Sequence, residues 1–368
     1  SRLIDWRKMT RSFSIYLDAL RLCAAFLVLM SHLAYPRFTE GRWIWIREIN
    51  LGSDAVIIFF VLSGLVISHS AQNKLITARR YAFDRLTRLY SVAFPALIVG
   101  FALDNIGSFI SPESYKGWHF NPLPFWEHLV RGLTFSNEWT GLYARLGTNG
   151  PYWSLSYEAA YYALFGIAIF TAGFRRVLLL SIGVLVAGLH VILLMPCWLF
   201  GVALQKLISQ GRIPVGKTAL IFAITPIVLY ILALMAGLPN LLSQQYSSAI
   251  QILRFSDEFV WNTLLAMLVT VHLLGIAGLS NSDTVPFQRS VRWLAASSFS
   301  LYLMHYPALQ FFSAIGLSGS TLVEDGTLLG VTCILCLLFA SFFERPLERI
   351  RNFLRPFFFK NSRPKMTR

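Results

Sequence analysis

Two ionisable residues, Arg21 and His32, lie in an otherwise apolar stretch, DALRLCAAFLVLMSHLAY at residues 18 to 35. Eleven residues advance a helix by about 16–17 Å and turn it back to within about 20° of its starting direction. If the stretch is a membrane helix, both side chains lie on one face, near opposite sides of the bilayer. Imidazole titrates near neutral pH, which makes His32 a candidate general base. Arg21 has an alternative role, since it can pair with Asp18 on the same face.

Two carboxylates in other apolar segments are candidates to orient this imidazole. Asp54 lies in NLGSDAVIIFFVLSGLVIS, and Glu158 lies well inside PYWSLSYEAAYYALF. Ionisable groups are costly inside a membrane and mark functional sites there by default, and a carboxylate beside a catalytic histidine stabilises its cationic form. Asp54 falls in the first turn of its segment, where it could instead cap a helix. We therefore favour Glu158 slightly as the partner of His32 and keep Asp54 as the alternative.

Three further polar residues are predicted to face a substrate. Ser154 precedes Glu158 by one helical turn and shares its face, while Tyr302 and His305 lie in the apolar stretch SSFSLYLMHYPAL. A buried histidine that only hydrogen-bonds a tyrosine or the backbone is the alternative for His305. The predicted substrate-binding residues are therefore Ser154, Tyr302 and His305.

An arginine pair in ARRYAFDRLTRLYSVAFP is the candidate phosphate site. Arg85 and Arg88 are neighbours on one helix face, and guanidinium groups bind phosphate oxygens in a bidentate manner. The alternatives are the excess of cations in cytoplasmic loops and an ion pair between Arg88 and Asp84. We expect Arg85 and Arg88, with Arg21, to bind a phosphorylated donor.

The elements that must position these residues are membrane helices. The chain is 55% hydrophobic and 14% charged, with a mean hydropathy of +0.57, whereas soluble domains are about a quarter charged. The net charge of +14 comes from residues between apolar runs and in the tails, so it indicates membrane orientation rather than nucleic-acid binding. The four cysteines lie in apolar runs without zinc-ligand partners, and the histidines form no ligand pair, so we expect neither a disulfide framework nor a metal.

The apolar runs predict an all-α polytopic bundle of about ten spans. The run at 197–209 is short enough to be tilted or re-entrant. The predicted spans are 14–34, 51–70, 90–109, 152–172, 177–195, 197–209, 218–237, 257–279, 297–316 and 327–344.

The distribution of cations predicts the topology. Of the 32 Lys and Arg residues, 24 fall on one side of the predicted spans and 7 on the other, and Arg21 lies within the first span. The side with more cations is cytoplasmic in most membrane proteins, so both termini are predicted to be cytoplasmic. The long loop 110–151 then lies outside, where it could contact a polar substrate or cap the bundle.

Several motifs together resemble the bacterial acyltransferase 3 family. They are Arg21 with ten residues before His32, IIFFVLSGLVIS, Arg85-x-x-Arg88, WSLSYE, SLYLMHYP and FFERPLERI. The chain is predicted to be a single domain, 1–368, and the resemblance covers its core, about 14–351. Residues 352–368 are predicted to form a basic cytoplasmic tail. It implies an enzyme of the bacterial inner membrane that moves an acyl group, most often acetyl, from acyl-coenzyme A to surface or lipid-linked carbohydrate.

The resemblance also implies residue roles. His32 and Arg21 match residues required for transfer, and Arg85 and Arg88 match residues associated with the acyl-coenzyme A donor. One departure concerns Ser91, where the family often has proline. The other reading from the residues is a transporter or flippase with Arg21, Glu158 and His305 as a relay. The sequence specifies neither the acyl group, the sugar, the oligomeric state nor whether an acyl-enzyme forms.

Overall fold

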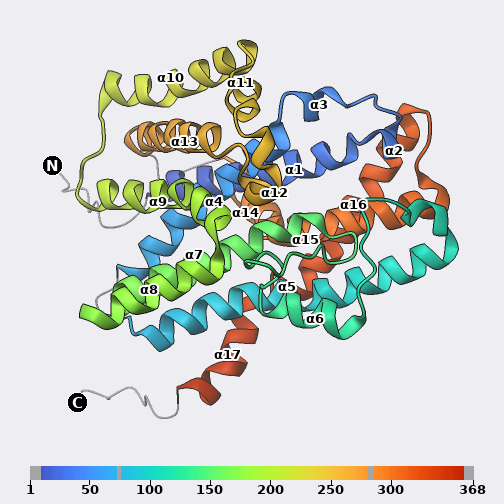
Figure 1. Cartoon of the computed structure of the whole chain (residues 1–368). Coiled ribbons are helices and arrows are strands. Elements are labelled where there is room, and N and C mark those ends of the chain that lie inside the picture. The colour runs from blue at the N-terminus through green and yellow to red at the C-terminus, as the bar shows by residue number, and fades with distance from the viewer. Residues whose placement is uncertain (1–9, 73–75, 281–285, 360–368) are drawn as a thin grey trace.

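The computed structural model describes residues 10–72, 76–280 and 286–359, and within these ranges the fold is all-helical, as predicted (Figure 1). Residues outside helices form turns, loops and isolated bridges. Ten longer helices build the bundle: α1 (Arg11–Leu33), α4 (Leu51–Ala71), α5 (Ala78–Ile110), α7 (Trp153–Phe170), α8 (Gly173–Ala187), α9 (Leu189–Ser209), α10 (Gly216–Met235), α13 (Phe259–Leu279), α15 (Ser298–Phe312) and α16 (Leu322–Phe343). Shorter helices connect or cover them: α2 (Pro36–Thr39), α3 (Trp45–Glu48), α6 (Phe125–Leu133), α11 (Leu238–Gln244), α12 (Ile250–Leu253), α14 (Gln288–Ala295) and α17 (Leu347–Phe358).

Seven helices of the described residues are long and apolar enough to cross a bilayer, namely α1, α4, α5, α9, α10, α13 and α16 with α17. Such helices indicate an integral membrane protein. The remaining three long helices, α7, α8 and α15, coincide with predicted spans but are shorter or less apolar. The predicted segments are thus helical over most of their length, while ten crossings and cytoplasmic termini stay predictions.

One predicted boundary between helices is wrong. The runs 177–195 and 197–209 were separated at Pro196, but α9 continues through this proline for 21 residues. The break comes instead at Gly188, whose φ of 92° and ψ of 163° suit glycine almost alone. A proline inside a membrane helix is tolerated because neighbouring helices satisfy the freed backbone groups. The run 197–209, predicted as a short span of its own that is tilted or re-entrant, is therefore the second part of α9.

Small residues let the central helices approach closely. A side chain added at Gly64 of α4 would collide with the backbone of α9 at Trp198, and one added at Gly201 of α9 would collide with α4 at Val61. This arrangement is typical of membrane helices, where packing rather than the hydrophobic effect holds the helices together. The α4–α9 contact holds in place α4, which lines one of the cavities of the candidate site.

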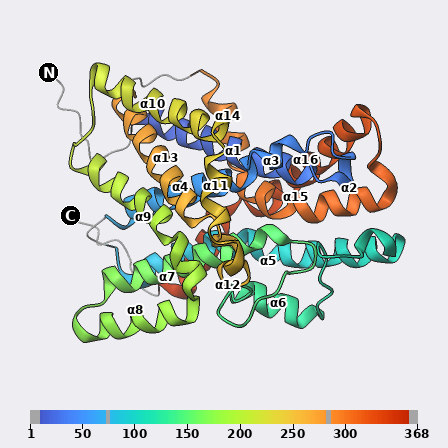
Figure 2. The same cartoon turned by 45° about the horizontal axis from the view of Figure 1, so that its top comes forward.

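The two ends of the bundle are defined by contacts between distant segments. At one end, the inner end, Arg21 of α1 donates to the Ala295 carbonyl over 3.1 Å, and Arg88 of α5 pairs with Glu344 over 3.2 Å. At the other, the outer end, Arg47 of α3 donates to the carbonyl of Ser31 over 2.9 Å. The names follow the topology predicted from charge. Both views place α2, α3 and α6 toward the right side of the bundle, its outer end (Figures 1 and 2).

The last described helix lies against the inner end of α5. Arg351 of α17 donates to the hydroxyl of Thr87 over 3.1 Å and to the carbonyl of Asp84 over 2.9 Å. The basic tail predicted at 352–368 thus begins within α17, and its part beyond residue 359 lies outside the described residues.

Candidate active site

The predicted base, His32, is hydrogen-bonded to His305, which was predicted to bind substrate. His32 lies in the last turn of α1, and His305 lies in the middle of α15 with no exposed surface. The Nδ1 atom of His32 and the Nε2 atom of His305 are 2.9 Å apart. The Nδ1 atom of His305 lies 2.9 Å from the carbonyl oxygen of Leu301. Two helices that are 273 residues apart in the chain therefore meet at one imidazole pair.

The hydrogen bonds of this pair fix which nitrogen carries a proton. A carbonyl only accepts, so Nδ1 of neutral His305 donates to Leu301 and its Nε2 must accept. Nδ1 of His32 then donates to that Nε2, which leaves the Nε2 of His32 with an unshared electron pair. This is the tautomer that a general base needs, and His305 can hold it through a catalytic cycle.

His32 faces a cavity of about 320 Å³ at the outer end. The cavity is bounded by α1, α3, the start of α4, the segment before α7 and the segment before α13, so it collects side chains from loops on the outer side. Its polar lining residues are Ser31, His32, Tyr35, Arg47, Asn50, Ser53, Arg145, Arg254, Asp257, Tyr302 and Tyr306. A polar molecule with hydroxyl groups therefore finds both a base and hydrogen-bonding partners there.

Asp54 does not orient His32. Its carboxylate accepts hydrogen bonds from the indole of Trp261 over 2.8 Å and from the hydroxyl of Tyr230 over 2.7 Å. The side chain is buried, with 3% of its surface exposed, between α4, α10 and α13. Satisfied, buried carboxylates of this kind hold helices together, so the predicted pairing of Asp54 with His32 is corrected to a structural role.

Glu158 is also held away from His32. Ser63 of α4 and Tyr162 of α7 each donate to its Oε1 atom over 2.5 Å, and the indole of Trp198 donates to Ser63 over 3.1 Å. The carboxylate thus belongs to a hydrogen-bond network between α4, α7 and α9. The expectation that it orients His32 is corrected as well, because His305 occupies that position.

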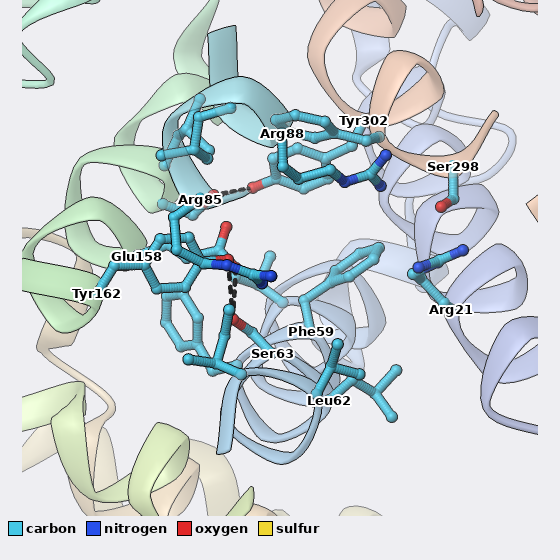
Figure 3. Close-up of a pocket in the computed structure, with 18 residues that line it drawn as sticks. Arg21, Phe59, Leu62, Ser63, Arg85, Arg88, Glu158, Tyr162, Ser298 and Tyr302 are labelled. Carbon is cyan, nitrogen blue, oxygen red and sulfur yellow. Dashed lines mark hydrogen bonds between the residues drawn. The ribbon is translucent and has the colours of Figure 1, made fainter. Parts of the chain in front are cut away.

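A second cavity, of about 150 Å³, opens at the inner end (Figure 3). All three predicted donor-binding arginines, Arg21, Arg85 and Arg88, line it, together with Glu158. Arg88 is held by Glu344, whose other oxygen accepts from the backbone N–H of Ser300 at the start of α15 over 2.8 Å. Three cations from α1 and α5 thus line one space, and their binding of a donor stays a prediction.

The two cavities adjoin, because two residues line both of them. Val56 of α4 and Tyr302 of α15 line both cavities. The Tyr302 hydroxyl lies 2.6 Å from the hydroxyl of Ser154 and donates to the carbonyl of Pro151 over 3.1 Å. Ser154 and Tyr302, predicted as substrate-binding residues, thus lie at the boundary between the cavities. His305 lies behind His32, among the residues that line neither cavity.

Sequence reasoning missed the cationic lining of the outer cavity. Arg47 and Arg145 are two of the seven cations on the side that the charge count assigns to the outside. Cations are less frequent in outer loops than in cytoplasmic ones, so each outer arginine was a possible functional residue. The charge count used only the totals on each side and did not consider these arginines one by one. Their convergence on His32 depends on loop conformations that have no periodicity to predict.

One family of known proteins matches most of the chain. The family described as "Acyltransferase domain" (Acyl_transf_3) matches residues 14–342. The acyltransferase MdmB of Streptomyces mycarofaciens is 32% identical over 155 residues, which are 40% of this chain and 37% of that protein. The match therefore spans little more than a third of that relative's length. No solved structure matches the chain.

Proposed function

Because the chain belongs to the acyltransferase 3 family of membrane acyltransferases, we propose that it transfers an acyl group, most simply acetyl, across the bacterial inner membrane. The donor is acyl-coenzyme A at the inner, cytoplasmic end, and the acceptor is a hydroxyl of surface or lipid-linked carbohydrate at the outer end. The observation that carries the proposal is the pair of cavities, one ringed by arginines and one holding His32, that meet at Val56 and Tyr302.

The inner cavity suits the phosphates of coenzyme A. Arg21 is paired with Asp18 over 3.2 Å and Arg88 with Glu344 over 3.2 Å, whereas Arg85 has no ion pair with any described carboxylate. Phosphate oxygens bind guanidinium groups strongly and in a fixed geometry. Arg85 therefore makes the principal contact, and the other two arginines add positive potential around it.

The bound thioester is then presented to the base. The pantetheine arm extends from the arginines past Val56 and Tyr302 and places the thioester carbonyl in the outer cavity. Nε2 of His32 takes the proton from the acceptor hydroxyl, whose oxygen attacks the carbonyl carbon. The tetrahedral intermediate collapses, the C–S bond breaks, and the proton on His32 passes to the departing thiolate. The products are the ester and coenzyme A.

His305 acts as a positioning residue for this step. Its Nε2 atom accepts from Nδ1 of His32 in the neutral state and continues to accept when His32 is protonated. A neutral acceptor beside an imidazolium stabilises the charge less than a carboxylate does. It also leaves the pair without a net charge in the resting state, which a membrane interior favours.

The Arg85→Gln substitution is expected to weaken coenzyme A binding by about tenfold or more, since it removes a charge-assisted contact to phosphate. The measurement is equilibrium binding of acetyl-coenzyme A to the purified protein in lipid nanodiscs. Arg175→Gln is the matched control, because this arginine is exposed on α8 and lines neither cavity. Equal affinities for wild type and Arg85→Gln would remove the phosphate assignment, and a transporter of another substrate would show no coenzyme A binding.

A further inference from the structure

We propose that the acceptor carries an anionic group, a carboxylate or a phosphate, and that Arg47 and Arg145 bind it in the outer cavity beside His32. This inference rests on the proposed function, because it names the chemical class of the acceptor. It adds a specificity site that is separate from the arginines at the inner end.

The charges that face the outer cavity do not balance. Three arginines line it, with one carboxylate, Asp257. Arg254 is already neutralised, since Glu138 accepts from its guanidinium over 2.7 and 3.1 Å. Arg47 and Arg145 form no ion pair with any carboxylate of the described residues, so Asp257 alone opposes two unpaired cations in the lining. The cavity therefore has positive potential without a bound ligand.

The guanidinium of Arg47 is held in place by neutral groups. It donates to the carbonyl of Ser31 over 2.9 Å and lies over the ring of Tyr35, with its Cζ atom 3.7 Å from the ring centroid. Both interactions fix the group without neutralising its charge. An arginine held rigidly with N–H groups to spare is preorganised to bind an anion.

Arg145 reaches the same cavity from the loop before α7. Its guanidinium lies over Trp118, 5.4 Å from the ring centroid, and a side chain added at Gly150 would collide with it. Glycine at position 150 therefore leaves the space that the guanidinium fills. The ring of Trp118, which is largely exposed, lies against Arg145 without neutralising its charge.

The distance between Arg47 and the base suits a small acceptor, because both groups contact the same tyrosine. The ring centroid of Tyr35 is 6.0 Å from that of His32 and 3.7 Å from Cζ of Arg47. A hydroxyl at His32 and an acidic group at Arg47 thus fit within one small polar unit, such as an acidic or phosphorylated sugar. Such a contact holds the hydroxyl against the base and raises its effective concentration. A neutral sugar would leave two half-buried cations without a counter-charge, which is costly.

The test uses three monosaccharide probes with the full-length protein in nanodiscs: methyl β-glucoside, methyl β-glucuronide and glucose 6-phosphate. Binding is measured by ligand-observed NMR in the presence of saturating coenzyme A, so that the arginines of the inner end are occupied. Acetyl transfer is measured in a separate assay by mass spectrometry, with acetyl-coenzyme A as the donor. The wild type is expected to bind at least one acidic probe about tenfold or more tightly than the glucoside.

The double substitution Arg47→Gln/Arg145→Gln is expected to bring this binding ratio close to one. Arg131→Gln is the matched control, because it removes a cation that is paired with Glu127 and does not line the cavity. The inference is overturned if the wild type binds all three probes equally, or if the preference survives the double substitution. Binding does not require transfer, so a charge preference without any transfer would count against the proposed function alone.

Discussion

The His32→Ala variant is expected to lose acyl transfer by about 10²- to 10⁴-fold, the range over which a positioned general base accelerates proton transfer. The loss should appear in two measurements. One is the amount of ester on the surface carbohydrate of the producing cell, and the other is the transfer rate of the purified protein with acetyl-coenzyme A. Coenzyme A affinity should be unchanged, since the inner cavity does not contain His32. A normal ester content in the variant would contradict the mechanism.

His305→Phe is the graded comparison for this variant, because phenylalanine keeps a ring of similar size but cannot accept from Nδ1 of His32. The expected loss is about 10- to 100-fold, which is the loss of one hydrogen bond to a charged group. Because His305 acts through His32, the pH dependence of the rate should shift as well. A purely structural role would lower the amount of folded protein and leave the pH profile of the remaining activity unchanged.

The Val56→Trp variant is expected to lower transfer by about 100-fold or more, since misplacing a reacting group by about 1 Å already costs that much. Val56 is buried in α4 and lines both cavities, so the larger ring would block the proposed route of the thioester from one cavity to the other. Coenzyme A binding at the arginines of the inner end should persist. The measurements are the transfer rate and the dissociation constant for coenzyme A in the same preparation.

Val56→Ile is the matched control, because it adds a single methylene at the same position and should retain most of the activity. Retained coenzyme A affinity in Val56→Trp shows that the variant is folded. If Val56→Trp transferred acyl groups at the wild-type rate, the thioester would not pass between Val56 and Tyr302, and the proposed route would be wrong.

The helices were the most predictable part of the fold. Their apolar runs are long, and a bilayer demands helices wherever such runs occur. The boundary near Pro196 was misplaced because the sequence is apolar almost continuously from 177 to 209, whereas Gly188 has the backbone conformation that separates α8 from α9. In a membrane, neighbouring helices can satisfy the backbone carbonyl that a proline leaves without a donor, so the helix continues. The backbone angles of Gly188 are not helical, so the helix ends there whatever its neighbours are.

The site was predictable as a set of residues but not as a set of contacts. Arg21, Arg85 and Arg88 line one cavity, as residues of one predicted depth can, because the direction of each span fixes the depth of its side chains. The partner of His32 was predicted among carboxylates, which are the usual partners of a catalytic imidazole. The structure brings His305 there instead.

Depth alone could not separate the candidates for that partner. Asp54, Glu158 and His305 all lie in apolar spans, and only the rotation of each helix about its axis decides which one meets His32. Rotation follows from side-chain packing between distant segments, such as the bonds of Trp261 and Tyr230 to Asp54. No single-sequence pattern records these pairings.

The most direct test of delivery across the membrane compares inverted with right-side-out vesicles from the producing cell. Both receive radiolabelled acetyl-coenzyme A from outside, and label is measured in ester-linked carbohydrate, with His32→Ala vesicles as the background. We predict that inverted vesicles, which expose the end with Arg85, incorporate label, and that intact right-side-out vesicles do so only after permeabilisation. Equal labelling of intact right-side-out vesicles would contradict the account, because the donor would then reach His32 from the outer side.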